Sequence, residues 1–531
     1  MNVKVFSSVC VSLLLFSCAI APSEDMPPAL NIKETVLYTL DNIEPQADMV
    51  VVSPDHKRLA LVLKKDTTYV VVLDGKESKP YDEVSKPRFS PDGSKCAFAA
   101  KEAGKWCIVE NGKPGAKYDA IEPKSVLYSP DGRLAFAIAK GDKQCVVMGG
   151  RELKQGKAIG QIHFSGDGKH FAFAISEPVA AEWGPKYDAS YLIVDTTELK
   201  DFESPMLFSF SPVGKRHGFI GTLKAGYAGG TAGVTGPGAN IIIDGAPVEK
   251  LGGTAWGGAS RQTVSFSEDC RHFGYSGNFA GDKYEAVIDG KRFGPYKIAF
   301  RPQFSPSGKA FGYFVETDAG LQVAVNGKVW TFREDGGGMG DTMSRPIAFS
   351  GNDSAAIRVK FAENGYYVAE NGKALTAYKW VSEPVYSPKG ELCYLASSED
   401  KSFLVRDGKE EVGPAGKFVD VSSTGVGVMF SPAGDACAFI MKGAEGQFVI
   451  LNGEKTYPLG AILDAARPAL SAIFSFGAQG AAAPPGPPGP PTFSAPEPAT
   501  QYTKCCFVSG NTLNLIARKD SKYIRYEIKV K

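Results

Sequence analysis

The sequence has almost no net charge. Its 531 residues include 59 Lys and Arg against 58 Asp and Glu, a formal net charge of +1 at pH 7. A nucleic-acid-binding protein needs clustered Lys and Arg to neutralise phosphates, so this balance argues against nucleic acid as a partner. Charged residues at 22% and aromatic residues at 11% also argue against wholesale disorder.

The common catalytic motifs are also missing from the sequence. It contains no Gly-x-Ser-x-Gly elbow, no Walker phosphate loop and no His-Glu-x-x-His zinc motif, and it has only five histidines. None of its ten cysteines stands in a CxxC pair, and several fall at equivalent positions of the repeat described below. We interpret the cysteines at these positions as small side chains that fill the core. We predict no catalytic residue, no metal and no cofactor.

Residues 1–17 are predicted to be an export signal. A single Lys precedes an apolar run that is too short for a membrane-spanning helix, which needs about 20 residues. The segment Leu15-Phe16-Ser17-Cys18 resembles the lipobox of bacterial lipoproteins, apart from Phe16, where a small residue is usual. This resemblance implies cleavage before Cys18 and diacylglycerol on its thiol. Cleavage after Ala21 and an uncleaved anchor are the alternatives.

A repeat of about forty residues fills the rest of the chain. The repeat unit has an apolar strand ending in Ser-Pro-Asp-Gly or a variant of it, strands of the types Ala-Phe-Ala and Val-Val, a turn that is usually Asp-Gly or Asn-Gly, and a short fourth strand. The Asn-Gly and Asp-Gly turns supply the positive φ angles of two-residue β-hairpins. The Ser of the first turn marks eleven copies: Ser53, Ser90, Ser129, Ser165, Ser211, Ser267, Ser305, Ser350, Ser387, Ser431 and Ser509.

The repeat predicts an all-β fold, a β-propeller built from about eleven four-stranded blades. Phe-Ser-Pro-Asp-Gly at 89–93, Tyr-Ser-Pro-Asp-Gly at 128–132 and the Asp-Gly-Lys turns are similar to the WD40-like repeats of TolB-type bacterial propellers. An outer-strand tyrosine recurs six residues after the Gly of the second turn. We expect these tyrosines to pack as wedges between neighbouring blades: Tyr81, Tyr118, Tyr296 and Tyr378.

Eleven blades exceed the four to eight that are usual in one ring. We therefore favour two rings, with repeats 1–5 at 33–260 and repeats 6–11 at 261–531, and keep one large ring as the alternative. Residues 18–32 would form a tether. The lone strand predicted at 34–40 could complete the last copy, which lacks a fourth strand.

Polar residues at the repeat turns suit structural roles. The Asp of Ser-Pro-Asp-Gly can bond to its own backbone, and several copies replace it with other residues. His170, His217 and His272 stand near the start of the second strand in copies four, five and six. Three imidazoles in neighbouring blades could hold a metal ion. Because adjacent blades diverge outward, we interpret them as solvated strand-edge residues.

Longer segments interrupt the repeat at 176–190, 223–240, 251–262, 334–343 and 464–500. The first two fall between second and third strands and the others between blades, so within each ring they share a face, where repeat proteins commonly bind their ligands. The last segment is rich in Pro, Gly and Ala and indicates an extended spacer.

Candidate binding residues lie in the insertions of copies four and five and in the connection that follows them. They are aromatic side chains, which protein interfaces favour. The alternative is that they only anchor their own loops. The candidates are Trp183, Tyr187, Tyr191, Tyr227 and Trp256.

Together these features predict an exported, non-catalytic binding or scaffold protein, anchored to a membrane through lipid at Cys18 on the periplasmic or surface side of the cell envelope. Its loop-insertion face would bind a protein or a cell-envelope polymer. The alternative is a propeller enzyme, a glycan hydrolase or lyase, with an axial active site.

The lipid anchor can be tested by substituting Cys18→Ala. Without the thiol no diacylglycerol can be attached, so we expect loss of globomycin-sensitive processing and of membrane fractionation. Cells producing the wild-type and substituted proteins would be fractionated and compared by immunoblot. Unchanged processing and fractionation would remove the lipoprotein assignment.

Overall fold

The structure is a computed structural model. It describes residues 30–46, 48–179, 187–223, 239–251, 264–280, 283–318, 320–331, 346–361, 365–398, 402–412, 417–418, 427–443, 446–456, 459, 461–462, 465–466, 471–472, 502–503, 506–509 and 512–529.

Blade 2 shows how one repeat folds. A central hairpin of β8 (Cys96–Glu102) and β9 (Lys105–Glu110) is flanked by β7 (Arg88–Phe89) on the inner side and β10 (Lys113–Tyr118) on the outer side. Most residues of β8 and β9 are buried. The turn from β9 to β10 is Asn111-Gly112, whose φ angles of 47° and 78° are those of a two-residue hairpin.

The described strands form eleven sheets of four or five strands, in the order of the repeats, and one additional two-stranded sheet. The only helix in the described residues is the short 3-10 helix η1 (Pro123–Ser125), and none there is long and apolar enough to cross a membrane. The eleven blades span residues 51–77, 83–118, 120–156, 158–199, 202–250, 265–296, 298–330, 348–378, 380–412 and 417–455, with blade 11 formed by 461–462, 506–529 and 31–39.

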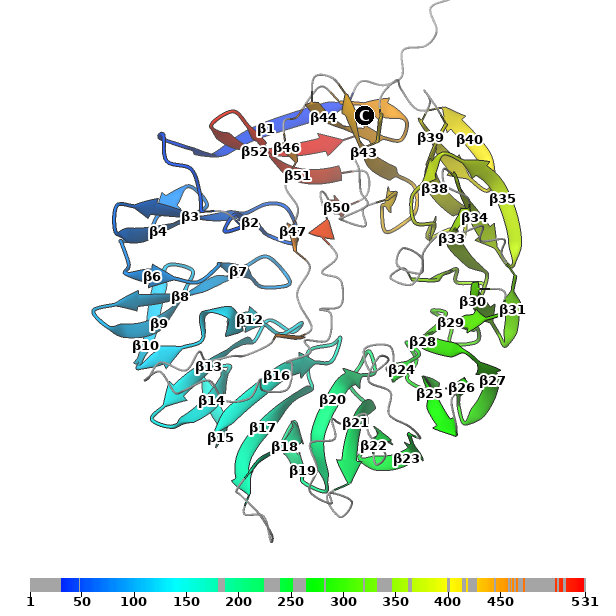
Figure 1. The fold of residues 1–531 in the computed structure, drawn as a ribbon. Helices are drawn as coiled ribbons and strands as arrows, with labels where there is room; N and C mark the ends of the chain where they lie inside the picture. Colours follow the sequence, from blue (N-terminus) through cyan, green and yellow to red (C-terminus); the bar gives the residue numbers. More distant parts are fainter. Residues whose placement is uncertain are drawn as a thin grey trace, which may run out of the picture.

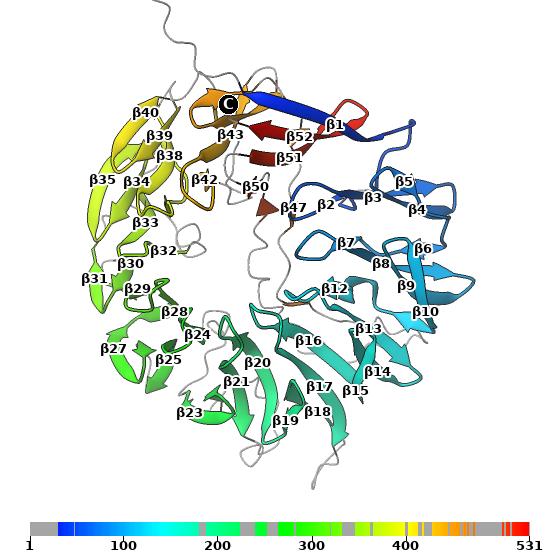
Figure 2. The ribbon, with the colours of Figure 1, turned by 180° about the vertical axis from the view of Figure 1, so that it is seen from behind.

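Apolar clusters between neighbouring blades hold the ring together. Each pair of successive blades shares a buried cluster, and another joins blade 11 to blade 1. Between blades 5 and 6, Ile220 and Ile241 pack with Tyr275 and Val287. The eleven-blade propeller is thus confirmed, and its blades follow one large ring (Figures 1 and 2), the alternative arrangement, instead of the favoured two rings.

The N-terminal strand closes the ring. β1 (Asn31–Thr39) pairs antiparallel with β52 (Lys522–Lys529), from Asn31 opposite Lys529 to Thr39 opposite Lys522. β52 also pairs with β51 (Thr512–Lys519), so β1 is the outermost strand of blade 11. The prediction that the first strand completes the last repeat is confirmed.

The recurrent outer-strand tyrosines pack against aromatic rings of the next blade, as predicted. In each case the partner lies on the second strand of that blade, so the pair fills the widening gap between two diverging sheets. The ring centroids are 6.1, 5.6, 6.2 and 6.4 Å apart in the pairs Tyr81–Phe98, Tyr118–Phe136, Tyr296–Tyr313 and Tyr378–Tyr394.

Cysteines on the central strands are core fillers, as predicted. Burial raises the pKa of the Cys96 and Cys393 thiols to about 12, so neither forms the reactive thiolate at neutral pH. The free, buried cysteines are Cys96, Cys107, Cys145, Cys393 and Cys437 on central strands and Cys270 in the first turn of blade 6. Cys10, Cys18 and Cys505 lie outside the described residues, as does the side chain of Cys506.

The innermost strand of several blades is split in two, as by the gap between β6 (Glu83–Val84) and β7 in blade 2. At three such gaps a buried serine, Ser85, Ser125 or Ser382, accepts a hydrogen bond of 2.9, 2.8 or 3.0 Å from a backbone N–H of the second strand. Each serine hydroxyl replaces a missing ladder carbonyl.

In blade 11 the same gap separates β46 (Ala461–Ile462) from β50 (Cys506–Ser509), because both pair with β51. This gap contains the 464–500 insertion. The expectation that this insertion lies between blades is therefore wrong: it interrupts the innermost strand of one blade, which lines the central opening (Figure 2).

Candidate functional site

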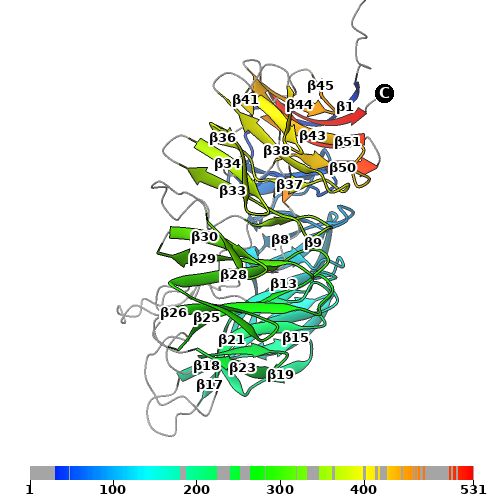
Figure 3. The same cartoon turned by 90° about the vertical axis from the view of Figure 1, so that its right-hand side faces the viewer.

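The two faces of the ring differ in the connections they carry. Turns joining first to second and third to fourth strands lie on the turn face, while connections between second and third strands and between blades lie on the opposite, loop face (Figure 3). In each of blades 1 to 10, two residues join the third strand to the fourth. The loop face carries the longer connections at 180–186, 224–238, 251–264 and 331–347.

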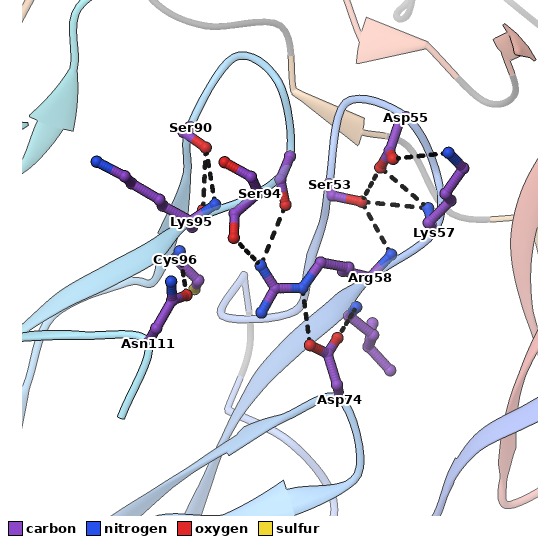
Figure 4. A network of polar contacts seen from close by, with 12 residues as sticks. Ser53, Asp55, Lys57, Arg58, Asp74, Ser90, Ser94, Lys95, Cys96 and Asn111 are labelled. Carbon is purple, nitrogen blue, oxygen red and sulfur yellow. Dashed lines mark hydrogen bonds and ion pairs between the residues drawn. The ribbon is translucent and has the colours of Figure 1, made fainter. Parts of the chain in front are cut away.

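The Ser of each first turn is the centre of a polar network on the turn face (Figure 4). Ser53 Oγ donates a hydrogen bond of 2.6 Å to Asp55 Oδ1 and accepts one of 2.9 Å from the Arg58 backbone N–H. The equivalent serines are at most 5% exposed, so their hydroxyls are structural: Ser53, Ser90, Ser129, Ser165, Ser211, Ser267, Ser305, Ser350, Ser387 and Ser431.

In nine of blades 1 to 10, the Asp or Asn that begins the third-to-fourth turn caps the start of its own blade's second strand, whereas blade 3 has Gly149-Gly150 at this turn. Asn111 Oδ1, for example, accepts a hydrogen bond of 2.9 Å from the Cys96 backbone N–H. This bond fixes the turn relative to the hairpin beside it. The same bond occurs at Asp74, Asp195, Asp244, Asp289, Asn326, Asn371, Asp407 and Asn452.

Turns of successive blades also contact one another. Arg58 Nε bonds Asp74 Oδ2 at 2.7 Å within blade 1, while Arg58 Nη1 donates to the carbonyl oxygens of Gly93 and Ser94 in blade 2, at 3.1 and 2.7 Å (Figure 4). A Cβ at Gly93, whose φ is 71°, would lie 2.8 Å from Asp55 Oδ1. Only glycine permits the turns of blades 1 and 2 to approach this closely, so these turns are closely packed on the turn face.

Carboxylates on the turn face are held ionised. Hydrogen bonds from the Ser90 and Ser94 hydroxyls and the Ser94 backbone lower the pKa of Asp92 to about 2. Hydrogen bonds from the Ser165 and Ser267 hydroxyls likewise lower the pKa of Asp167 and Asp269, respectively. A general acid requires the opposite shift, so these groups serve as hydrogen-bond acceptors, in agreement with the structural role predicted for this position.

The three candidate histidines do not converge. His170 and His272 each bond the turn Asp of their own blade, with Nδ1 at 2.8 Å from Asp195 Oδ2 and 2.7 Å from Asp289 Oδ2. They occupy the position that Arg58 has in blade 1. His217 follows Arg216, which bonds the turn Asp of blade 5 instead. Across the described part of the chain, no three His, Cys, Asp or Glu side chains are grouped to hold a metal ion.

Of the five candidate binding residues, only Tyr191 has a described side chain. It lies on β18 (Tyr187–Val194), is 6% exposed and packs in the cluster between blades 3 and 4. The Lys154 and Lys200 ammonium groups lie 5.6 and 5.2 Å from its ring centroid. Tyr191 therefore anchors its strand, which is the alternative role considered above.

The other four candidates remain predictions. Trp183, Tyr227 and Trp256 lie outside the described residues, and Tyr187 is described by its backbone alone. That backbone shows that the 176–190 insertion is not all loop: β17 (Phe171–Val179) and β18 pair as far as Val179 opposite Tyr187. The blade 4 hairpin thus extends toward the loop face.

Sequence reasoning missed two short strands in the last insertion, β47 (Ala465–Ala466) and β48 (Ser471–Ala472), and a third directly after it, β49 (Tyr502–Thr503). β47 pairs with β49, and β48 pairs with the innermost strand of blade 4. Two-residue strands have no periodicity, so no pattern in the sequence indicates them.

No family model and no curated protein matches the chain. Similar solved structures include the β-propeller domain of the Trilobed protease from Pyrococcus furiosus, with 15% identity, coverage of 54% of this chain and 97% of that chain, and a TM-score of 0.25. TolB from Acinetobacter baumannii has 15% identity, coverage of 46% and 61%, and a TM-score of 0.20. A eukaryotic initiation factor has 12% identity, coverage of 68% and 95%, and a TM-score of 0.35. At these values no function is transferred to this chain.

The turn network can be tested with Ser90→Ala. At pH 7 we expect a loss of stability of about 1–3 kcal/mol, because the substitution removes the donor to Asp92 and the acceptor for the Lys95 N–H. The folded-state pKa of Asp92, about 2, lies below its ordinary value of 3.8. The Asp92 contribution is therefore complete above the ordinary pKa and is lost as the pH falls from about 4 to about 2. Urea unfolding across this pH range should show that the loss of stability caused by Ser90→Ala becomes smaller as the pH falls.

Ser211→Ala is the matched control. Ser211 Oγ accepts from the Arg216 N–H at 3.0 Å, but the residue two positions on is Val213, which has no carboxylate. The loss of stability caused by Ser211→Ala should therefore be constant between pH 4 and pH 2. An effect of Ser90→Ala that is equally constant would contradict the role assigned to Asp92.

Proposed function

We propose that the protein is a non-catalytic binding or scaffold protein that uses the loop face of its propeller to bind a protein or a cell-envelope polymer. The observation that carries this proposal is that the connections between strands vary widely in length on only one face of the ring. The third-to-fourth connection has the same two-residue length in blades 1 to 10, whereas the loop-face connections reach fifteen residues at 224–238 and seventeen at 331–347. Length variation confined to one face is typical of a binding face on a constant frame.

The chemistry of the turn face supports this division. Its serines, aspartates and asparagines bond to backbone groups within and between blades, as Ser53, Asn111 and Arg58 illustrate. A side chain that holds a turn in place cannot be exchanged for ligand recognition without loss of stability. The loop face has no such restriction, because residues added between two paired strand ends leave both ladders unchanged.

Blades 4 and 5 are the preferred sector of the loop face. Their second-to-third connections, at 180–186 and 224–238, lie in neighbouring blades. The extended hairpin of β17 and β18 is fixed at its base by Tyr191, which gives the blade 4 connection a rigid support. The remaining candidates supply aromatic contact area, which protein interfaces favour: Trp183, Tyr187, Tyr227 and Trp256.

The proposed location is outside the cytoplasm, in the cell envelope. This rests on the export signal predicted at 1–17 and on the resemblance of residues 15–18 to a lipobox, which would place the lipid on Cys18. Residues 19–30 would link the lipid to β1, the outermost strand of blade 11. Fully extended, twelve residues span about 40 Å, so the tether would keep the ring close to the membrane.

The binding face can be tested by shortening the connections of blades 4 and 5. Val179 and Tyr187 are directly opposite in the ladder, so an Asn-Gly turn can replace residues 180–186, and a short Gly-containing turn can replace 224–238. We expect the propeller to stay folded and a partner that crosslinks to the wild-type protein in the native envelope to be lost. Circular dichroism and crosslinking with mass spectrometry measure the two results.

The matched control shortens the connection at 332–345, which lies on the same face between blades 7 and 8. This variant should keep the crosslinked partner. Retention of the partner by the blade 4 and 5 variant would show that the sector is wrongly assigned. Turnover of an envelope glycan by the purified wild-type protein would favour the alternative, a propeller enzyme.

A further inference from the structure

The innermost strand of blade 4 differs from those of the other blades. β16 (Ala158–Phe164) pairs with β17 inside the blade and also, on its opposite edge, with β48. Ala472 lies opposite Ile162, and Ser471 lies opposite His163. Among the eleven described blades, only blade 4 receives a strand on this inner edge from another part of the chain.

That additional strand comes from across the ring. β46 belongs to blade 11, β47 lies beside β2 (Val51–Val52) of blade 1, and β48 reaches blade 4. Figures 1 and 2 both show β47 at the inner ends of the blades. Five residue steps from Ala466 to Ser471 span at most about 18 Å. We refer to β46, β47 and β48 together as the axial strap.

The inner edge of β16 has the properties of a strand acceptor. β16 has seven residues, but β48 pairs with only two of them. An unfilled strand edge presents backbone N–H and C=O groups that an extended peptide can pair with. Two paired positions supply few backbone hydrogen bonds, so this ladder is weak and a longer peptide could displace it.

The chemistry of this edge favours an uncharged occupant. The sequence of β16, Ala-Ile-Gly-Gln-Ile-His-Phe, contains no Asp, Glu, Lys or Arg. The His163 ring packs against Phe208 with centroids 5.2 Å apart, and burial lowers the pKa of His163 to about 4, so the imidazole is neutral at pH 7. The resident segment, Ser471-Ala472, is likewise small and uncharged.

We propose that the inner edge of β16 is a strand-acceptor site for an extended, uncharged peptide of a partner protein, and that β48 occupies this site in the free protein. The site lies at the central opening, so it is separate from the loop face proposed above and does not depend on it. Binding of the partner peptide requires release of β48 from β16.

The register of the strap permits a precise deletion. Ala466 and Tyr502 lie directly opposite in the ladder between β47 and β49, so an Asn-Gly turn can join them in place of residues 467–501. This variant removes β48 and keeps the β47 and β49 ladder. The matched control removes 477–500 behind a Gly-Ser linker and keeps β48.

The probe is a fluorescein-labelled peptide with the uncharged sequence of residues 469–476, and its binding is followed by fluorescence anisotropy. We expect the variant without β48 to bind it at least tenfold more tightly than the wild-type protein or the control. A peptide with Pro at the positions of Ser471 and Ala472 lacks the ladder donors and should not bind. Equal binding to all three proteins, no binding to any folded variant, or equal binding of the Pro peptide would each overturn the proposal.

Hydrogen exchange provides a second readout on the protein itself. Amides within 158–164 should exchange at least tenfold faster in the variant without β48 than in the control, and the added peptide should restore protection. If the deletion does not fold, the double substitution Ser471→Pro and Ala472→Pro in the full chain can be tested in the same way. Unchanged exchange in a folded variant that lacks β48 pairing would also overturn the proposal.

Discussion

Cohesion between neighbouring blades is the constraint on which the rest of the structure depends. The central strands of a blade are buried on both faces: β8 packs toward blade 1 through Phe98 and toward blade 3 through Ala99. A single blade would leave both faces in water, so it cannot be stable alone. The apolar clusters continue from every blade to the next. A closed ring buries both apolar faces of every blade, because it has no first or last blade with an exposed face. β1 completes it by supplying the last blade with its outer strand.

Closure of the ring divides the molecule into regions with different freedom to vary. The turn face tolerates little variation, because its polar side chains form hydrogen bonds within each turn and to the turn of the next blade. Arg58, for example, donates to the carbonyl oxygens of Gly93 and Ser94. The loop face can lengthen without disturbing a ladder. The innermost strands form a third region, where gaps in the pairing admit inserted chain, as between β46 and β50. The two proposed binding sites use the second and third regions.

Much of this fold could be predicted from the sequence, because its signals are local. Asn111-Gly112 marks a hairpin by its own dihedral preferences, and Tyr378 recurs at a fixed distance from its turn. The number of rings could not be predicted, because it depends on whether Ile220 and Tyr275 share a cluster across a long connection. For the same reason the sequence did not distinguish Tyr191, which is buried, from aromatic residues that face a ligand. The strap depends on pairing between segments some 300 residues apart, which leaves no local pattern.

The central claim, that one face of the ring recognises a partner and the other maintains the frame, can be tested most directly by site-specific photo-crosslinking in the native envelope. A photoreactive side chain would replace Trp183 or the exposed Asp142 on the loop face, or the exposed Thr196 on the turn face. Thr196 lies in the same blade as Trp183 and makes a matched control. The account predicts a partner adduct from the loop-face positions and none from Thr196. An adduct that forms from Thr196 as efficiently as from Trp183 would contradict it.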